Sequence, residues 1–326
     1  MRKENSNMKK YILAIIVALI GVFGTKAQTF EKIKYGDFEQ WITRTIPESR
    51  IIGGHKKTLY EIGPTESITG NIPYTNKGGS PWATSNVLAN VMGIVKGSNA
   101  VFPEDRVGGG KCCKLTCLME HCKAIGIINI DVVVAGSIFL GKMIEPIKST
   151  SDPYSKMEMG IKFTRRPKAL RFDYSLTIPD GDTRTYSSGF GKKKTYKGHD
   201  CAEAYILLQR RFEDEDGNIY AKRVGTGRLH LDKSTNGWVN GFEIPVLYGD
   251  ITSRTDYKSY MGLIPEEDSY YATNSKGKMV KVVETGWDRE DATPTHMLIM
   301  LSAGSGKAYI GTIGLTLLVD NVGLVF

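Results

Sequence analysis

The alternation of apolar and polar residues at a period of two constrains this chain more than any other feature. In the stretch LRFDYSLTI, every second residue from Leu170 to Ile178 is apolar, and the residues between them are Arg, Asp, Ser and Thr. Such a pattern predicts a β-strand that is buried on one face. Further strand-like stretches are INIDVVVAGSIFL, AYILLQRRF, IYAKRV, FEIPV, MLIML and the apolar run at the C-terminus.

Turns and loops separate these stretches, and no long amphipathic helix is predicted. Glycine accounts for 36 of the 326 residues, which suits frequent turns. Residues 179–200 and 249–295 are long, polar and without a regular period, so we expect loops there that carry binding sites. One short helix is predicted at residues 84–92. Several strands are apolar on both faces, as inner strands of a sandwich are, so the fold class is all-β.

The C-terminal run GTIGLTLLVDNVGLVF, residues 311–326, is almost wholly apolar and contains a single acid, Asp320. Chain termini are usually polar and frayed. This run therefore predicts a closing strand that is buried within the sandwich.

The first 27 residues have the pattern of a secretory signal peptide. Two lysines precede the apolar run Tyr11–Phe23, and residues 25–27 resemble a cleavage site. Met8 offers an alternative start, and an uncleaved N-terminal anchor is the alternative interpretation. Residues 28–326 are then predicted to form a single exported domain with no integral membrane segment, located in the periplasm, at the cell surface or outside the cell.

Removing this segment lowers the formal net charge from +8 to +4, because it carries five basic residues and one acid. So mild a charge argues against nucleic acid as a partner.

Four of the five cysteines crowd into CCKLTCLMEHC, and the fifth is Cys201. No two of them have the C-x-x-C spacing that is typical of zinc sites. A disulfide between Cys117 and Cys122 is possible across a turn in an exported protein. Buried thiols packed within strands are the other interpretation.

Two short motifs suggest a nucleotide or metal site at first sight. SAGSGKA at 302–308 lacks the first Gly and the last Ser or Thr of a phosphate-binding loop, and strands surround it. EDEDGNIY at 213–220 has Ile219 where a calcium loop needs Gly, so Asp216-Gly217 is predicted to form a hairpin turn. No facing pair of carboxylates for glycoside hydrolysis can be nominated from the sequence.

Several separated motifs occur in one order along the chain. They are YGDFEQW at 35–41, GGSPWATSN at 78–86, KLTC at 114–117, IKFTRRPKALRFDYSL at 161–176, AYILLQ at 204–209, FEIPVLY at 242–248 and the closing segment from 294 to 326. With these motifs the chain resembles the putative carbohydrate metabolism domain family, exported proteins of Gram-negative bacteria that live on complex glycans. Many relatives carry a lipobox Cys, which this chain lacks.

The resemblance implies a galactose-binding-like jelly roll, similar to carbohydrate-binding modules, and no established reaction. In modules of this shape the first and last strands lie together and often hold one structural calcium ion. Asp37 and Glu39 in the first strand and Asp320 in the last are the acids expected to form this site, because Ca²⁺ prefers oxygen ligands. The alternative is that these acids cap loops or accept hydrogen bonds from exposed amides.

Sugar binding requires aromatic platforms for the apolar faces of pyranose rings and planar polar groups for the hydroxyls. The aromatic candidates, mostly in or beside the long loops, are Trp238, Tyr257, Tyr260, Tyr270, Tyr271 and Trp287. The polar candidates are Arg165, Arg166 and Asn240. Trp238 alternates in phase with Phe242 and Ile244, so a place in the core is its alternative.

These observations predict an exported, non-catalytic protein that binds an oligosaccharide or polysaccharide. An exported structural or adhesion protein that binds a protein partner is one alternative. A glycoside-active enzyme is another, and it requires two facing carboxylates in a cleft.

Overall fold

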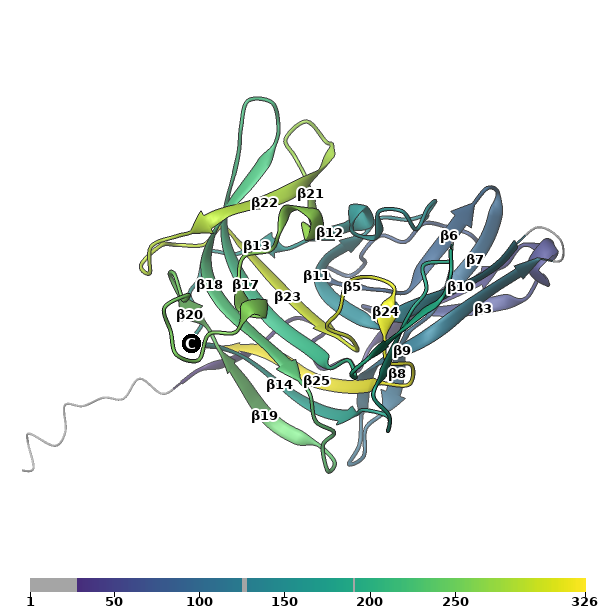
Figure 1. Ribbon diagram of the computed structural model, residues 1–326, viewed down its shortest axis with the longest axis horizontal. Helices are drawn as coiled ribbons and strands as arrows, with labels where there is room; N and C mark the ends of the chain where they lie inside the picture. Colours follow the sequence, from purple (N-terminus) through teal and green to yellow (C-terminus); the bar gives the residue numbers. More distant parts are fainter. Residues whose placement is uncertain (1–27, 125–127, 190) are drawn as a thin grey trace, which may run out of the picture. The chain divides into compact units, whose positions relative to one another are not determined.

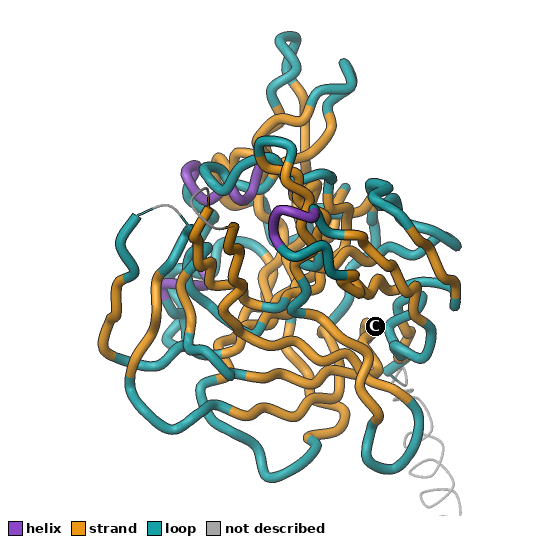
Figure 2. The backbone as a smooth tube through the Cα atoms, turned by 90° about the vertical axis from the view of Figure 1, so that its right-hand side faces the viewer, coloured by secondary structure: helices purple, strands orange, loops and turns teal. Residues whose placement is uncertain are grey.

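The structure is a computed structural model, and it describes residues 28–124, 128–189 and 191–326. The predicted signal peptide lies outside these residues. Residues Glu31–Phe326 group into one compact unit. The described residues contain strands and four short 3₁₀ helices but no α-helix, as the strand-rich trace in Figure 2 shows. None of the helices in this part of the chain is long and apolar enough to cross a bilayer.

A seven-stranded sheet forms one layer of the fold (Figure 1). Its main path runs β10 (Ile128–Ala135), β9 (Lys111–Ala124), β25 (Thr316–Val325), β14 (Ala169–Thr177) and β19 (Val239–Pro245), with β1 (Phe30–Lys32) beside β25 and β8 (Val101–Asp105) beside β9. The closing strand β25 therefore lies at the middle of this sheet, between β9 and β14.

A ten-stranded sheet forms the second layer. Its path runs β13 (Ile161–Lys162), β23 (His296–Ser302), β17 (Ala202–Glu213), β18 (Ile219–Leu231), β22 (Met279–Trp287), β21 (Tyr271–Thr273), β12 (Met157–Met159), β11 (Ser137–Met143) and β5 (Trp82–Thr84), with β20 (Leu247–Tyr248) beside β18. Strand β11 also pairs with β23, so this sheet curls back on itself.

Smaller sheets and turns complete the fold. They are β3-β2-β4 (Lys56–Ile62, Trp41–Pro47, Glu66–Thr69), β16-β15-β24 (Lys194–Lys197, Thr183–Tyr186, Ile310–Gly311), the pair β6 (Val87–Val91) and β7 (Ile94–Ser98), and the 3₁₀ helices η1 (Arg50–Ile52), η2 (Pro153–Lys156), η3 (Ser259–Met261) and η4 (Glu266–Asp268).

The main core lies between the two large sheets, and the period-two alternation of the strands builds it. In β14, the residues Leu170, Phe172 and Leu176 are fully buried, and they pack against Leu317 and Val319 of β25 in the same apolar cluster. A second cluster lies on the other face of the ten-stranded sheet. The predicted all-β sandwich is therefore confirmed, and its core is the apolar half of each alternating strand.

The closing strand lies beside the beginning of the domain, as predicted. The backbone N–H of Ile33 donates to the carbonyl of Val322 at 3.0 Å, and the N–H of Val322 donates to the carbonyl of Gly36 at 2.7 Å. These bonds explain why the C-terminus is not frayed. The predicted hairpin turn at Asp216-Gly217 is also confirmed, because β17 and β18 pair antiparallel on either side of it.

One local prediction, the short helix, is wrong, and of the two interpretations of the cysteines the structure supports free thiols in strands. Within residues 84–92, Thr84 ends β5 and Val87–Val91 form β6 instead of a helix, and β6 pairs antiparallel with β7. Cys117 and Cys122 both lie on one continuous strand, β9. Because an extended strand rises about 3.3 Å per residue, their Cα atoms are too far apart for a disulfide. All five cysteines are free thiols.

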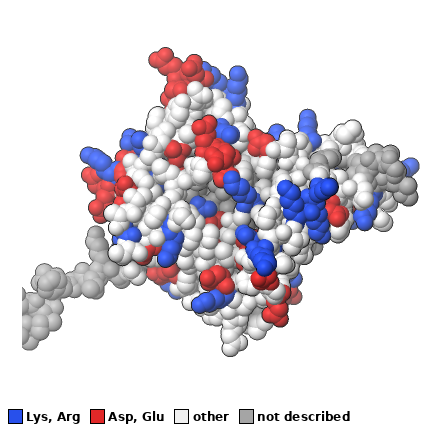
Figure 3. Space-filling model, viewed as in Figure 1, with Lys and Arg blue, Asp and Glu red and all other residues white. Residues whose placement is uncertain are grey.

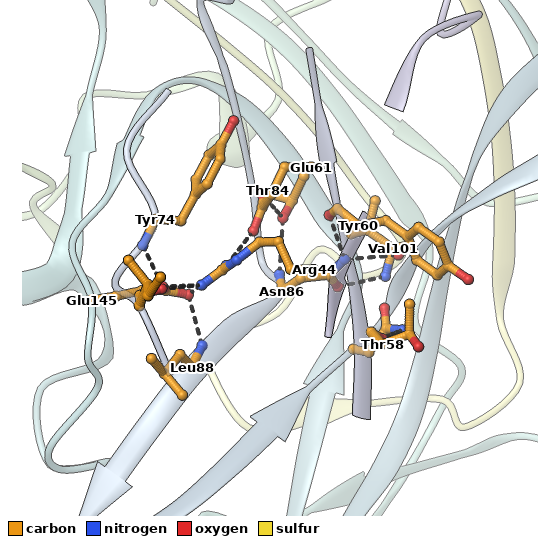
Figure 4. Close-up of polar contacts among 12 residues, drawn as sticks. Arg44, Thr58, Tyr60, Glu61, Tyr74, Thr84, Asn86, Leu88, Val101 and Glu145 are labelled. Carbon is orange, nitrogen blue, oxygen red and sulfur yellow. Dashed lines mark hydrogen bonds and ion pairs between the residues drawn. The ribbon is translucent and has the colours of Figure 1, made fainter. Parts of the chain in front are cut away.

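A buried ion network connects the β3-β2-β4 sheet to the rest of the unit (Figure 4). Arg44 of β2 donates to Glu61 of β3 at 2.7 Å and to Glu145, just after β11, at 2.6 Å. Glu61 also accepts a bond from Thr84 at 2.8 Å, and Glu145 accepts one from the backbone N–H of Leu88 in β6 at 2.7 Å. The network thereby fixes the β6–β7 hairpin.

Candidate functional site

A groove of about 830 Å³ lies over the face of the ten-stranded sheet that points away from the main core. Residues of β17, β18 and β23 form its floor. The β6–β7 hairpin, strand β10 and residues from the segments 147–157, 264–270 and 304–310 form its walls. Binding sites usually occupy concave surfaces that combine apolar and polar side chains, so this groove is the candidate site.

The alternation of β17 decides which side chains reach the groove. Its even-numbered residues between 202 and 208 belong to the main core, so Glu203 and Tyr205 project from the opposite face. The register pairs Glu203 with His230 and Tyr205 with Arg228 on β18. Residues opposite each other in an antiparallel pair lie on one side of the sheet. The groove floor therefore carries a compact group of polar and aromatic side chains.

Glu203 is held as an anion between two cations. It accepts hydrogen bonds from Arg228 Nε at 2.7 Å and from His230 Nε2 at 3.1 Å. Burial raises the pKa of Glu203, but the bonds from His230 and Arg228 outweigh it, so its pKa lies below the ordinary value. Burial lowers the pKa of His230, but hydrogen bonds with Cys201 and Glu203 raise it overall to about 9. Near neutral pH this group therefore carries fixed charges.

Four tyrosines contribute the aromatic part of the groove: Tyr154, Tyr205, Tyr270 and Tyr309. The hydroxyl of Tyr205 donates to that of Tyr270 at 2.9 Å, and the rings of Tyr154 and Tyr270 meet edge to face at 5.7 Å. Tyr309 has a left-handed backbone, with φ 68°, which the turn before β24 imposes. Burial raises the pKa of Tyr309 to about 12, so its hydroxyl stays protonated and can donate.

The loop SAGSGKA forms one end of the groove. Asp200 Oδ1 accepts hydrogen bonds from the backbone N–H of Ser305 at 3.1 Å, from its hydroxyl at 2.8 Å and from the backbone N–H of Cys201 at 2.9 Å. The loop runs from β23 into β24, so it has the strand neighbours that the sequence predicted and no helix of a phosphate-binding loop. Its role is to shape the groove.

Each of the four carboxylates that line the groove has a partner. Glu120 pairs with Lys57 at 3.2 Å, Asp152 accepts from the Tyr271 hydroxyl at 2.8 Å, Asp268 pairs with Lys307 at 3.3 Å, and Glu203 pairs as described above. These acids are therefore committed to contacts within the protein.

A comparison with known protein families identifies the family of this chain. The model of the family described as "Putative carbohydrate metabolism domain" matches residues 38–325, which is most of the chain. The chain belongs to this family. Membership relates it to carbohydrate metabolism, as the motifs of its sequence predicted. No curated protein matches the sequence.

Three solved structures are similar to this member of the family. A putative glycoside hydrolase from Bacteroides thetaiotaomicron is 18% identical with a TM-score of 0.43, and the match covers 84% of this chain and 76% of that one. A putative glycoside hydrolase from Bacteroides vulgatus is 16% identical with a TM-score of 0.43, covering 91% and 94%. A carbohydrate-binding module specific for non-crystalline cellulose is 12% identical with a TM-score of 0.26, covering 76% and 90%.

Three of the ligand residues predicted for this family member lie in or near the groove. Tyr270 lines it. Tyr260 stacks on the ring of His230, with centroids 3.8 Å apart and planes inclined by 17°. Tyr271 donates to Asp152, which lines the groove. The fold brings these three together through η3, η4 and β21.

The other predicted ligand residues do not line the groove. Trp238 lies under the guanidinium of Arg106 at 4.3 Å, and Asn240 accepts a bond from Arg106 at 2.6 Å. The remaining contacts are Arg165 with Glu31 at 2.6 Å, Arg166 with the carbonyls of Glu290 and Ala292, Trp287 with the guanidinium of Arg223 at 5.7 Å, and Tyr257, which is half-buried beside Gly262. Each of these contacts supports the local fold.

The acids of the predicted calcium site do not have the arrangement on paired strands that the sequence analysis expected. Asp37 and Glu39 do not share a face of the first strand, because β1 ends at Lys32 and the left-handed backbone of Phe38, with φ 49°, interrupts the alternation. Glu39 accepts a bond from the backbone N–H of Lys111 at 3.1 Å. Among the described residues, no three His, Cys, Asp or Glu side chains are grouped to hold a metal.

Asp320 faces an arginine. It lies opposite Asp173 across β25 and β14, and Arg106 donates to both carboxylates. Burial raises the pKa of Asp320, and Asp173 adds to that rise, while Arg106 opposes it. The calcium site stays a prediction, and calorimetric titration of Ca²⁺ into chelator-treated protein tests it.

The sequence analysis missed Glu203, Tyr205, Arg228 and His230. In β17 the run from Ala204 to Leu208 is apolar on both faces, which hides the alternation, and Arg228 and His230 lie beyond the predicted strand IYAKRV. The signal that could have found them is the odd-numbered series in AEAYILL, where Glu203 and Tyr205 fall on one face.

Proposed function

We propose that the groove binds a carbohydrate and that the protein is an exported, non-catalytic carbohydrate-binding member of its family. The observation that carries this proposal is the combination of tyrosine rings with a fixed, charged polar group on the groove floor. Tyrosine rings pack against the apolar faces of pyranose rings, and their hydroxyls bond sugar hydroxyls. Export rests on the signal-peptide pattern of residues 1–27, which lie outside the described structure.

The state of Glu203 supports binding rather than glycoside cleavage. A glycosidase needs one carboxyl group with a raised pKa to protonate the leaving oxygen. The pKa of Glu203 is lowered, despite its burial, by its bonds with His230 and Arg228, so it is ionised at neutral pH. A fixed anion of this kind orients sugar hydroxyls but donates no proton.

Isothermal titration of the chain without residues 1–27 against a panel of oligosaccharides tests the proposal. We expect Tyr154→Ala and Tyr309→Ala each to weaken binding by about 1 kcal/mol, about fivefold in Kd, because each removes one aromatic contact. Phe212→Ala is the matched control, because Phe212 is an exposed aromatic outside the groove. Equal losses in the groove variants and the control, or no binding to any glycan, would contradict the proposal.

A further inference from the structure

A basic hairpin continues the wall of the groove. We use this name for strands β15 and β16 together with Lys192 and Lys193, which precede β16. Strand β15 pairs with β24 through Tyr186 and Ile310, and Ile310 lines the groove. Gly189 and Gly191, between the two strands, line it as well. A ligand lying in the groove can therefore extend onto this hairpin without leaving the protein surface.

The hairpin carries positive charge without acids to balance it. Lys192, Lys193, Lys194 and Lys197 are exposed, and the sequence holds no Asp or Glu from 183 to 199. Within the described ranges none of these lysines forms an ion pair; Lys193 is near enough to Asp131 to help lower its pKa, after the hydrogen bond from His121. Figure 3 shows Lys and Arg side chains gathered between the places where Figure 1 labels β24 and β10.

Aromatic and cationic side chains share one face of the hairpin. The register pairs Arg184 with Tyr196 and Tyr186 with Lys194, so these four side chains point to the same side. The Nε atom of Arg184 is buried and has no hydrogen-bond partner in the described part of the chain. Tyr186 is close enough to the groove residue Tyr309 to contribute to the rise of its pKa, after burial and Tyr154.

The groove itself is lined by four acids, Glu120, Asp152, Glu203 and Asp268, and by four bases, Lys96, Lys156, Arg228 and Lys307. All four carboxylates that line it are engaged by partners within the protein. Lys156 lines the groove too, and no ion pair with it is found among the described residues. The excess of positive charge therefore lies on the hairpin that borders the groove.

From this arrangement we propose that the ligand is an anionic polysaccharide, whose sugars carry carboxylate or sulfate groups. This inference rests on the proposed function and names its ligand class. The tyrosines of the groove and the hairpin contact the sugar rings, while Arg184 and the lysines face the anionic substituents. A carbohydrate is favoured over a nucleic acid because the chain belongs to a carbohydrate metabolism domain family, and single-stranded DNA is the competitor in the test below.

A matched pair of ligands tests the charge requirement. Oligogalacturonate and its methyl ester have the same sugar rings, but the ester is neutral. In isothermal titration at low salt we expect the free acid to bind on the order of tenfold tighter, because several exposed ion pairs are gained, and this difference should shrink as salt is added. Comparing dextran sulfate with dextran tests sulfate in the same way. The two comparisons together show whether carboxylate or sulfate groups are recognised.

A charge-matched set of variants locates the effect. Lys192→Gln/Lys193→Gln/Lys194→Gln should lose on the order of tenfold in affinity for the anionic ligand that binds and little for the methyl ester. The control Lys168→Gln/Lys233→Gln/Lys278→Gln removes the same charge from exposed positions outside the groove lining and the hairpin. All six lysines are exposed, so both variants should fold.

Distinct results overturn the inference and the proposed function. If neutral and anionic forms bind equally, or the two triple variants lose equally, the inference fails while carbohydrate binding stands. If single-stranded DNA of matched charge competes as well as the anionic glycan, the inference also fails, because the hairpin would then attract any polyanion. If no saccharide binds at all, both proposals fail.

Discussion

Replacing Arg44 with methionine should destabilise the protein strongly, because it would leave two buried carboxylates without their shared cation. The side chain of Arg44 is 1% exposed, and those of Glu61 and Glu145 are 3% and 1% exposed. Removing one partner of a buried ion pair costs about 3–5 kcal/mol, whereas an exposed pair contributes about 0–1 kcal/mol. We therefore expect a loss of about 3–5 kcal/mol in the free energy of unfolding for Arg44→Met at pH 8.

The assay is urea denaturation followed by tryptophan fluorescence, with Lys77→Met as the control. Lys77 forms an ion pair with Glu66 at 2.6 Å, but both side chains are about 40% exposed. The control should therefore lose about 0–1 kcal/mol. If the two variants lose similar amounts, or if Arg44→Met stays within about 1 kcal/mol of the wild type, the assignment of the network as a buried, charged one is refuted.

The pH dependence of Arg44→Met gives an independent check. Burial raises the pKa of Glu61 to about 8, although Arg44 opposes the rise. Because this value lies above the ordinary 4.5, the contribution of Glu61 to stability is fully present below pH 4.5 and is lost as pH rises through 8. Without Arg44 the pKa rises further, so the deficit of the variant should shrink between pH 8 and pH 6 as the carboxyl group takes up a proton.

Two further predictions concern the groove floor and the cysteines. The pKa of His230 is about 9, above the ordinary 6.5, so its stabilising contribution is fully present below pH 6.5 and is lost as pH rises through 9. The wild type should therefore lose stability relative to His230→Gln between pH 7 and pH 10 in urea titrations, and parallel pH profiles would contradict the charged pair with Glu203. Only Cys122 and Cys201 are not fully buried, so a thiol reagent should label two cysteines in the native chain and five in denaturant. A count of three in denaturant would reveal a disulfide.

The strands of the sandwich could be predicted from the sequence because the alternation within each strand shows which of its residues are buried. The alternation from Leu170 to Ile178 corresponds to β14, and the apolar C-terminal run corresponds to β25 at the middle of its sheet. A hairpin turn at Asp216-Gly217 is equally local, since the turn residues and the flanking strands lie within one stretch. Features that depend only on residues close together in the sequence could therefore be predicted.

The candidate site was less accessible, because its members meet only through pairing between distant strands. Glu203 and Arg228 are 25 residues apart, and the register of β17 with β18 places them together. Asp320 shows the same limit, because its place in the fold could be predicted but its partner could not. Its burial in a closing strand followed from the sequence, but its partner, Arg106, is 214 residues away in the chain.

The sequence by itself determined that this chain forms an all-β sandwich of the carbohydrate metabolism domain family, because hydrophobic periodicity and motif order are properties of single strands. Only the tertiary structure decided which tyrosines and charges converge on the groove, which aromatics brace loops, and where the basic hairpin lies. The physical reason is that a strand's pattern states how deeply each residue is buried, whereas sheet register and loop packing decide what each buried or exposed side chain meets.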